Sequence, residues 1–143
     1  MRWALLLAVA CCSAAAGDLA TVRAEPNLEK RSAKALENAA AALKTAREAY
    51  DKGDSAGVAA AAAEISDSVE LAWTSLQQTG KNPRRSPKWF KRAEIDTRDL
   101  ARRVENFQQQ MSYTDRAVLD PVKAKIHQVH DDLLVGLMEG KRK

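Results

Sequence analysis

The chain has 143 residues, enough for one domain, and a formal net charge of +4. Its hydrophobic content of 45% overstates the material for a core, because much of it is alanine and aromatic residues make up only 5%. Alanine favours helix but buries little apolar surface. No GxSxG or SxxK motif and no glycine-rich phosphate loop occurs in the sequence. We therefore expect no enzyme and no cofactor.

The N-terminus has the pattern of a secretory signal peptide. Arg2 precedes an apolar run over residues 3–10, and small residues follow. The run is too short to span a bilayer, which needs about 20 apolar residues. Cleavage fits after Ala24 or after Ala16, and we favour Ala24 because the helical pattern begins only at Asn27. The sequence thus predicts a signal peptide over residues 1–24 and one periplasmic or extracellular domain over residues 25–143.

Both cysteines of the chain lie in the predicted signal peptide. A lipid-anchored form is an alternative, because Cys12 has the aliphatic Val9 three residues before it, whereas Cys11 has only Ala8. It is less favoured, because Cys11 directly precedes Cys12 and the apolar run is short. Residues 25–143 contain no cysteine. This excludes disulfides, thiolate metal sites and cysteine nucleophiles from that part of the chain.

The two halves of the predicted domain differ in charge. Residues 25–80 carry 6 basic and 9 acidic side chains, whereas residues 81–143 carry 15 basic and 9 acidic ones. The halves should attract each other in the folded protein and leave one basic surface.

The first two predicted helices cover residues 27–52 and 55–79. Asn27 can cap the first, Gly53 suits the left-handed turn between them, and Asp54 or Ser55 can cap the second. The first helix has a narrow apolar face that is rich in alanine. The expected core positions of the pair are Leu36, Ala39, Leu43, Ala46, Tyr50, Val58, Ala62, Ile65, Val69, Ala72 and Leu76.

A third helix over residues 87–111 carries the clearest pattern in the chain. Ser86 is the expected cap, and Pro87 fits a first turn, where its missing N–H costs nothing. Apolar positions recur at alternating steps of three and four, which predicts a single buried face between charged flanks. That face is formed by Phe90, Ala93, Thr97, Leu100, Val104, Phe107 and Met111.

The fourth segment contains a proline near its start. Asp120 is the expected cap and Pro121 the first helical residue, which predicts either a short helix over residues 115–119 followed by a long one, or a single kinked helix. The long helix should bury Val122, Ile126, Val129, Leu133 and Leu137.

These segments predict an all-α fold, namely an up-down-up-down four-helix bundle that follows the signal peptide. The alternative is a three-helix arrangement in which the alanine-rich pair packs as an arm. The short turn at Gly53 makes the first two helices antiparallel neighbours in either case.

A basic-aromatic segment over residues 81–92 is the candidate binding site. It contains no acidic residue and surrounds two aromatic residues with six cations. Such a segment could bind an anionic lipid or polysaccharide surface, and export argues against nucleic acid. In the competing interpretation Phe90 is core, Trp89 covers the bundle end, and the cations pair with the acidic half. The candidate binding residues are Arg84, Arg85, Lys88, Trp89, Lys91 and Arg92.

Two histidines provide a weaker candidate for a metal site. His127 and His130 lie three residues apart, and Asp131 follows, so all three could share one face of a helix. No Glu-x-x-His pair accompanies them, so the di-iron bundle pattern is absent. Solvated or edge-packed histidines are the simpler interpretation.

We therefore expect a non-enzymatic exported bundle that binds a protein or an anionic envelope surface through residues 81–92. A metal-binding bundle that uses His127, His130 and Asp131 is the alternative.

Overall fold

The computed structural model describes residues 19–140, so the predicted signal peptide up to residue 18, both cysteines and residues 141–143 lie outside the described residues. The described part is entirely helical and contains no strand. Its elements are α1 (Leu19–Arg23), α2 (Leu28–Asp51), α3 (Ser55–Gln78), α4 (Lys88–Gln110), the 3₁₀ helix η1 (Arg116–Leu119) and α5 (Asp120–Glu139). The predicted all-α fold class and the approximate bounds of the long helices are confirmed.

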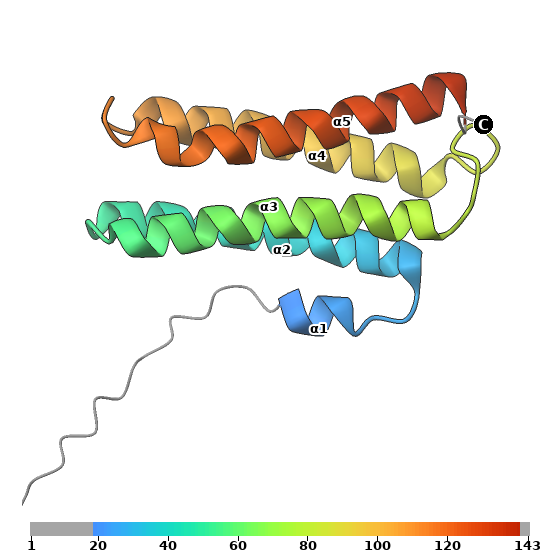
Figure 1. Ribbon diagram of the computed structural model, residues 1–143, viewed down its shortest axis with the longest axis horizontal. Coiled ribbons are helices and arrows are strands. Elements are labelled where there is room, and N and C mark those ends of the chain that lie inside the picture. Colours follow the sequence, from blue (N-terminus) through green and yellow to red (C-terminus); the bar gives the residue numbers. More distant parts are fainter. Residues whose placement is uncertain (1–18, 141–143) are drawn as a thin grey trace, which may run out of the picture.

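The four long helices lie side by side as two antiparallel pairs, α2 with α3 and α4 with α5 (Figure 1). Their directions alternate along the chain. Between the pairs, α2 packs on α4 and α3 packs on α5, so the helices that meet there run parallel. The loop from α3 to α4 consequently joins helices that lie diagonally opposite. Because the alanine-rich pair contacts both later helices, it is not a separate arm.

The apolar face predicted on α4 is buried along its whole length. All seven of its expected residues, from Phe90 to Met111, are in the core. Near its C-terminal end, the Phe107 ring meets the Tyr50 ring edge-on, with centroids 5.8 Å apart. The Arg47 guanidinium lies 5.3 Å from the centroid of the Phe107 ring. Phe107 therefore joins α4 to α2 by packing and by a cation–π contact.

The contact between α2 and α3 is made mainly of alanine. Small side chains let two helices approach closely, and those buried here are Ala35, Ala39, Ala42, Ala46, Ala49, Ala61, Ala62 and Ala72. One polar bridge crosses this contact. The Asn38 amide donates to Glu64 Oε1 at 3.1 Å and to Ser68 Oγ at 2.9 Å. All three of these polar residues are buried.

The short helix α1 is an element that the sequence did not predict. Val22 is only 8% exposed and belongs to the core. The chain after α1 is held to α2, because Arg31 Nε donates to the Glu25 carbonyl at 2.8 Å and the Lys34 ammonium pairs with the Glu25 carboxylate. The hydrogen bond from Lys34 lowers the pKa of Glu25. Residues 19–25 are thus part of the folded structure.

Two predicted helix caps form and two do not. Asn27 accepts a hydrogen bond from the Lys30 amide, and Asp54 accepts one from the Gly57 amide, each at 2.9 Å. The predicted cap at Ser86 is wrong. Pro87 occupies the cap position, because its carbonyl accepts the first bond of the helix, from the Lys91 amide, so Ser86 lies one residue too early in the chain.

The predicted cap at Asp120 is also wrong, because η1 runs directly into α5 and leaves no gap for a cap. The Asp120 carboxylate instead accepts a hydrogen bond from Gln108 Nε2 at 2.7 Å. This bond connects the start of α5 to the end of α4. Of the two arrangements predicted around Pro121, the structure has the short helix followed by the long one.

Replacing Phe107 by alanine should lower the free energy of unfolding by about 3–5 kcal/mol, because it removes a buried ring and leaves a cavity. The exposed Gln109→Ala should change it by less than about 0.5 kcal/mol. Urea unfolding followed by circular dichroism measures both values. Equal effects of the two substitutions would show that α4 does not hold the pairs together through Phe107.

Candidate functional site

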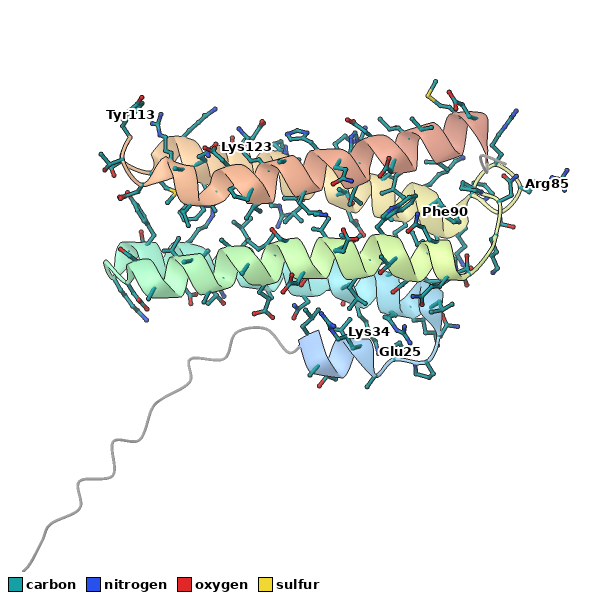
Figure 2. The ribbon with its side chains drawn as sticks, in the orientation of Figure 1. Glu25, Lys34, Arg85, Phe90, Tyr113 and Lys123 are labelled. Carbon is teal, nitrogen blue, oxygen red and sulfur yellow. The ribbon has the colours of Figure 1, made fainter. Side chains whose placement is uncertain are left out.

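The basic-aromatic segment (residues 81–92) forms one end of the bundle, where the α3–α4 loop meets the last turn of α5. Pro83 packs against Gly136, where an added Cβ would lie 3.2 Å from Pro83 Cγ. The Asn82 side chain accepts a hydrogen bond from the Arg84 amide at 2.9 Å, and the Asn82 carbonyl accepts one from the Ser86 amide, also at 2.9 Å. The loop is therefore anchored by its own turn and by α5, and Arg85 extends outward from it (Figure 2).

Ion pairs divide the cations of this segment into two groups. Lys81 Nζ lies 2.5 Å from Glu29 Oε1, and Arg92 reaches Glu37 at 3.9 Å and Asp96 at 3.7 Å. Glu29 and Glu37 belong to α2, so these two cations meet the acidic half as the competing interpretation predicted. The remaining cations of the segment make no ion pair with any residue in the range 19–140: Arg84, Arg85, Lys88 and Lys91. We call these four residues the unpaired cations.

The aromatic residues of the segment lie at its inner side. Phe90 is buried, and the half-buried Trp89 packs against the core. The Lys88 ammonium lies 5.3 Å from the centroid of the Trp89 ring, close enough for a cation–π contact. Trp89 therefore covers the core, as the competing interpretation predicted, and also contacts one of the cations of the candidate binding site, Lys88.

The start of α4 adds a further positive element. No side chain of residues 19–140 caps this helix, so the amides of its first turn lack the side-chain acceptor that a capped helix has. The aligned peptide dipoles place partial positive charge at such an end. Lys88 and Lys91 lie on this first turn. Their charges and the helix dipole would both attract an anion.

A cavity of about 360 Å³ lies beside the segment. Its walls are more apolar than polar, and it is lined by Trp73, Gln77, Lys81, Pro83, Phe90, Asp132, Val135, Gly136 and Gly140. The sequence did not predict it, because it depends on Pro83 folding back onto α5. Gly136, a glycine within the apolar pattern of the last helix, was the available signal for this close approach.

The two histidines of α5 each contact a different glutamate of α4. His130 Nε2 lies 2.9 Å from Glu94 Oε1, and both side chains are nearly buried. His127 Nε2 lies 3.7 Å from Glu105 Oε1, and its side chain is 49% exposed. Asp131 is exposed and approaches only the other ring nitrogen of His130, at 3.7 Å. Among residues 19–140, no three His, Cys, Asp or Glu side chains are grouped so as to hold a metal ion.

Comparisons with known proteins give no match: no family model fits the chain, and neither a curated protein nor a solved structure is significantly similar to it. Within the described residues, no helix has both the length and the hydropathy that a bilayer span requires. A function for the chain has to be argued from its own geometry.

His130→Ala should lower the free energy of unfolding by about 1–3 kcal/mol, because it leaves the nearly buried Glu94 carboxylate without its closest partner. His127→Ala is the matched control and should have little effect, since its contact is long and exposed. Thermal and urea unfolding of both variants at neutral pH provide the measurement. If His127→Ala is the more destabilising change, the α4–α5 contact does not depend on the His130–Glu94 pair.

Proposed function

We propose that this protein is an exported, non-enzymatic four-helix bundle of the up-down-up-down type that binds an anionic envelope surface, lipid or polysaccharide, through residues 81–92. The observation that carries the proposal is the group of unpaired cations on the anchored loop and on the first turn of α4. A solvated basic helix face usually alternates with acidic residues, but residues 81–93 contain none. Among residues 19–140, the carboxylates that pair with the segment's cations contact only Lys81 and Arg92, at its two edges.

The chemistry of these side chains favours phosphate or carboxylate groups as ligands. Arg84 and Arg85 each carry a planar fork of donors that can bind an oxyanion in two places. Lys88 and Lys91 supply compact charges beside them at the positive end of α4. Because the loop is already anchored through Asn82 and Pro83, little conformational entropy would be lost on binding.

Replacing Arg84, Arg85 and Lys88 together by serine should weaken binding to anionic vesicles by roughly 100-fold, since each cation near an anionic surface contributes about 1 kcal/mol. Vesicle co-sedimentation at two salt concentrations measures the effect. Binding of the parent protein should also weaken as salt rises, because exposed charges are screened beyond about 10 Å at 0.1 M salt.

The matched control replaces Lys44, Arg102 and Arg103 by serine. It also removes three positive charges, but at positions away from this end of the bundle. It should retain most of the binding, and both triple variants should keep the helical content of the parent. Equal losses of binding in the two variants would show that binding depends on the net charge of the protein and not on residues 81–92. Repeating the assay with an acidic polysaccharide in place of the vesicles distinguishes a polysaccharide surface from a lipid surface.

For export, the fold favours cleavage after Ala16 over the site after Ala24. Cleavage after Ala24 would remove α1 and expose the core residues that Val22 now covers. N-terminal sequencing of the protein recovered from its own host should therefore give Gly17. Glu25 at the N-terminus would show that α1 is discarded. An intact Met1 would contradict export, and a diacylglycerol mass on a cysteine would identify a lipid anchor.

A further inference from the structure

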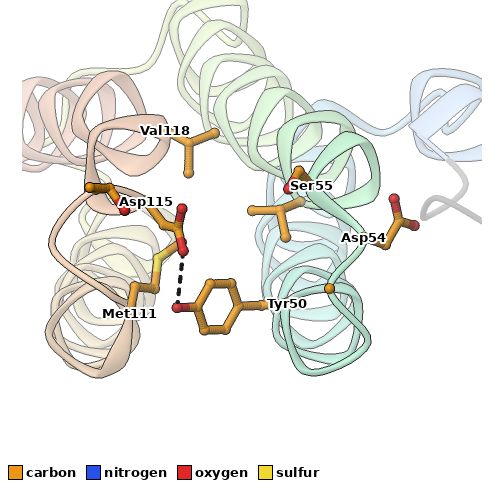
Figure 3. A pocket seen from close by; sticks show the side chains of 9 residues that line it. Tyr50, Asp54, Ser55, Met111, Asp115 and Val118 are labelled. Atoms are coloured by element: carbon orange, nitrogen blue, oxygen red, sulfur yellow. Dashed lines mark hydrogen bonds between the residues drawn. The ribbon is translucent and has the colours of Figure 1, made fainter.

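A second and larger cavity lies at the opposite end of the bundle, between the α2–α3 turn and the segment that joins α4 to α5 (Figure 3). Its volume is about 540 Å³, within the range typical of small-molecule sites, which often lie between the helices of bundles. The residues that line it include Tyr50, Asp54, Val58, Met111, Asp115 and Val118.

Apolar side chains form the inner wall of this cavity. Val58 and Met111 belong to the buried core, and the half-buried Val118 packs against it. The Tyr50 ring forms another wall and is held by its edge-on contact with Phe107. These groups are fixed by the packing of the helices, so the wall is already in place for an apolar ligand.

A network of hydrogen bonds holds one carboxylate at the cavity. The Tyr50 hydroxyl accepts a bond from the Ser112 amide at 2.8 Å and donates to Asp115 Oδ2 at 3.3 Å. Ser112 Oγ donates to the same oxygen at 2.5 Å. Both donors reach Oδ2, whereas Oδ1 of Asp115 accepts no hydrogen bond from the described residues. Asp115 therefore has an oriented carboxylate with one oxygen available to a ligand.

The charges around the cavity favour a cation. Its lining contains two carboxylates and no lysine or arginine. Asp54 is occupied as the cap of α3 and points away from Tyr50, so Asp115 is the charge that faces inward (Figure 3). The neighbouring Arg116 makes no ion pair with Asp115, and its guanidinium donates instead to the carbonyls of Met111 and Gln109 within the described part of the chain.

We propose that this cavity binds a small organic cation, an ammonium group attached to an apolar body. The ammonium would bind Oδ1 of Asp115, and the body would pack against Val58, Met111 and Val118. This inference is independent of the function proposed for residues 81–92, which lie at the other end of the bundle.

The test is a titration of the isotope-labelled full chain with naphthylmethylammonium, followed by amide chemical shifts. Naphthylmethanol is the matched neutral probe. The amides of Ser55, Asp115 and Val118 should shift, whereas those of residues 84–92 should not. The alcohol should bind about 10-fold more weakly or worse, because a hydrogen bond to a charged group is stronger than one between neutral groups.

Two variants distinguish the cavity from non-specific binding. Asp115→Asn keeps acceptors for Tyr50 and Ser112 but removes the charge, so it should weaken binding of the ammonium about 10-fold or more and leave the alcohol unchanged. Val118→Trp should fill the cavity and abolish binding of both probes. Asp51→Asn, a change at an exposed carboxylate outside the lining, is the control.

The proposal is overturned if the ammonium shifts none of the cavity amides, or if the alcohol binds as tightly. An equal loss in Asp51→Asn and Asp115→Asn would also overturn it. The melting temperature of each variant checks that it folds, and Val118→Trp tests the cavity even if Asp115→Asn is unstable.

Discussion

The fold depends on burial of the single apolar face of α4. This face packs against α2 on one side and α5 on the other, and it supplies both phenylalanines of the chain, Phe90 and Phe107. The alanine-rich pair provides little apolar area of its own, because an alanine buries only a methyl group. The larger side chains of α4 and α5 must therefore cover it. The two ends of the bundle, with their cavities, lie where this packing stops.

Much of the fold could be predicted from periodicity, since spacing alone places Leu100, Val104 and Phe107 on one face, and all three are buried. The arrangement of the helices could not be predicted in the same way. Antiparallel neighbours follow from a short turn such as that at Gly53, but a nine-residue connection does not determine whether α4 lies beside α3 or diagonally across from it. The cap expected at Ser86 failed for a local reason, because the first hydrogen bond of the helix goes to the Pro87 carbonyl and the helix therefore begins one residue later.

The candidate binding segment could be predicted from its composition. The composition does not show, however, which of its cations are unpaired. Lys81 meets a glutamate of α2 because it follows the end of α3, which packs on α2, and Arg92 meets another because α2 lies beside α4. Those contacts are separated in sequence by more than 50 residues, and no local pattern encodes them. The cavity at Asp115 could not be predicted from the sequence for a related reason. Its walls come from segments far apart in the chain, namely the α2–α3 turn and η1 with its neighbours.

The polar bridge of Asn38, Glu64 and Ser68 has a consequence for how α2 and α3 are aligned. A contact made of identical methyl groups looks nearly the same after one helix slides by a turn of about 5.4 Å. Such a slide would leave the buried amide and carboxylate without partners, and each orphaned group would cost roughly 1–3 kcal/mol. The bridge therefore selects one register among several that packing alone would tolerate, much as a single buried asparagine does in a coiled coil.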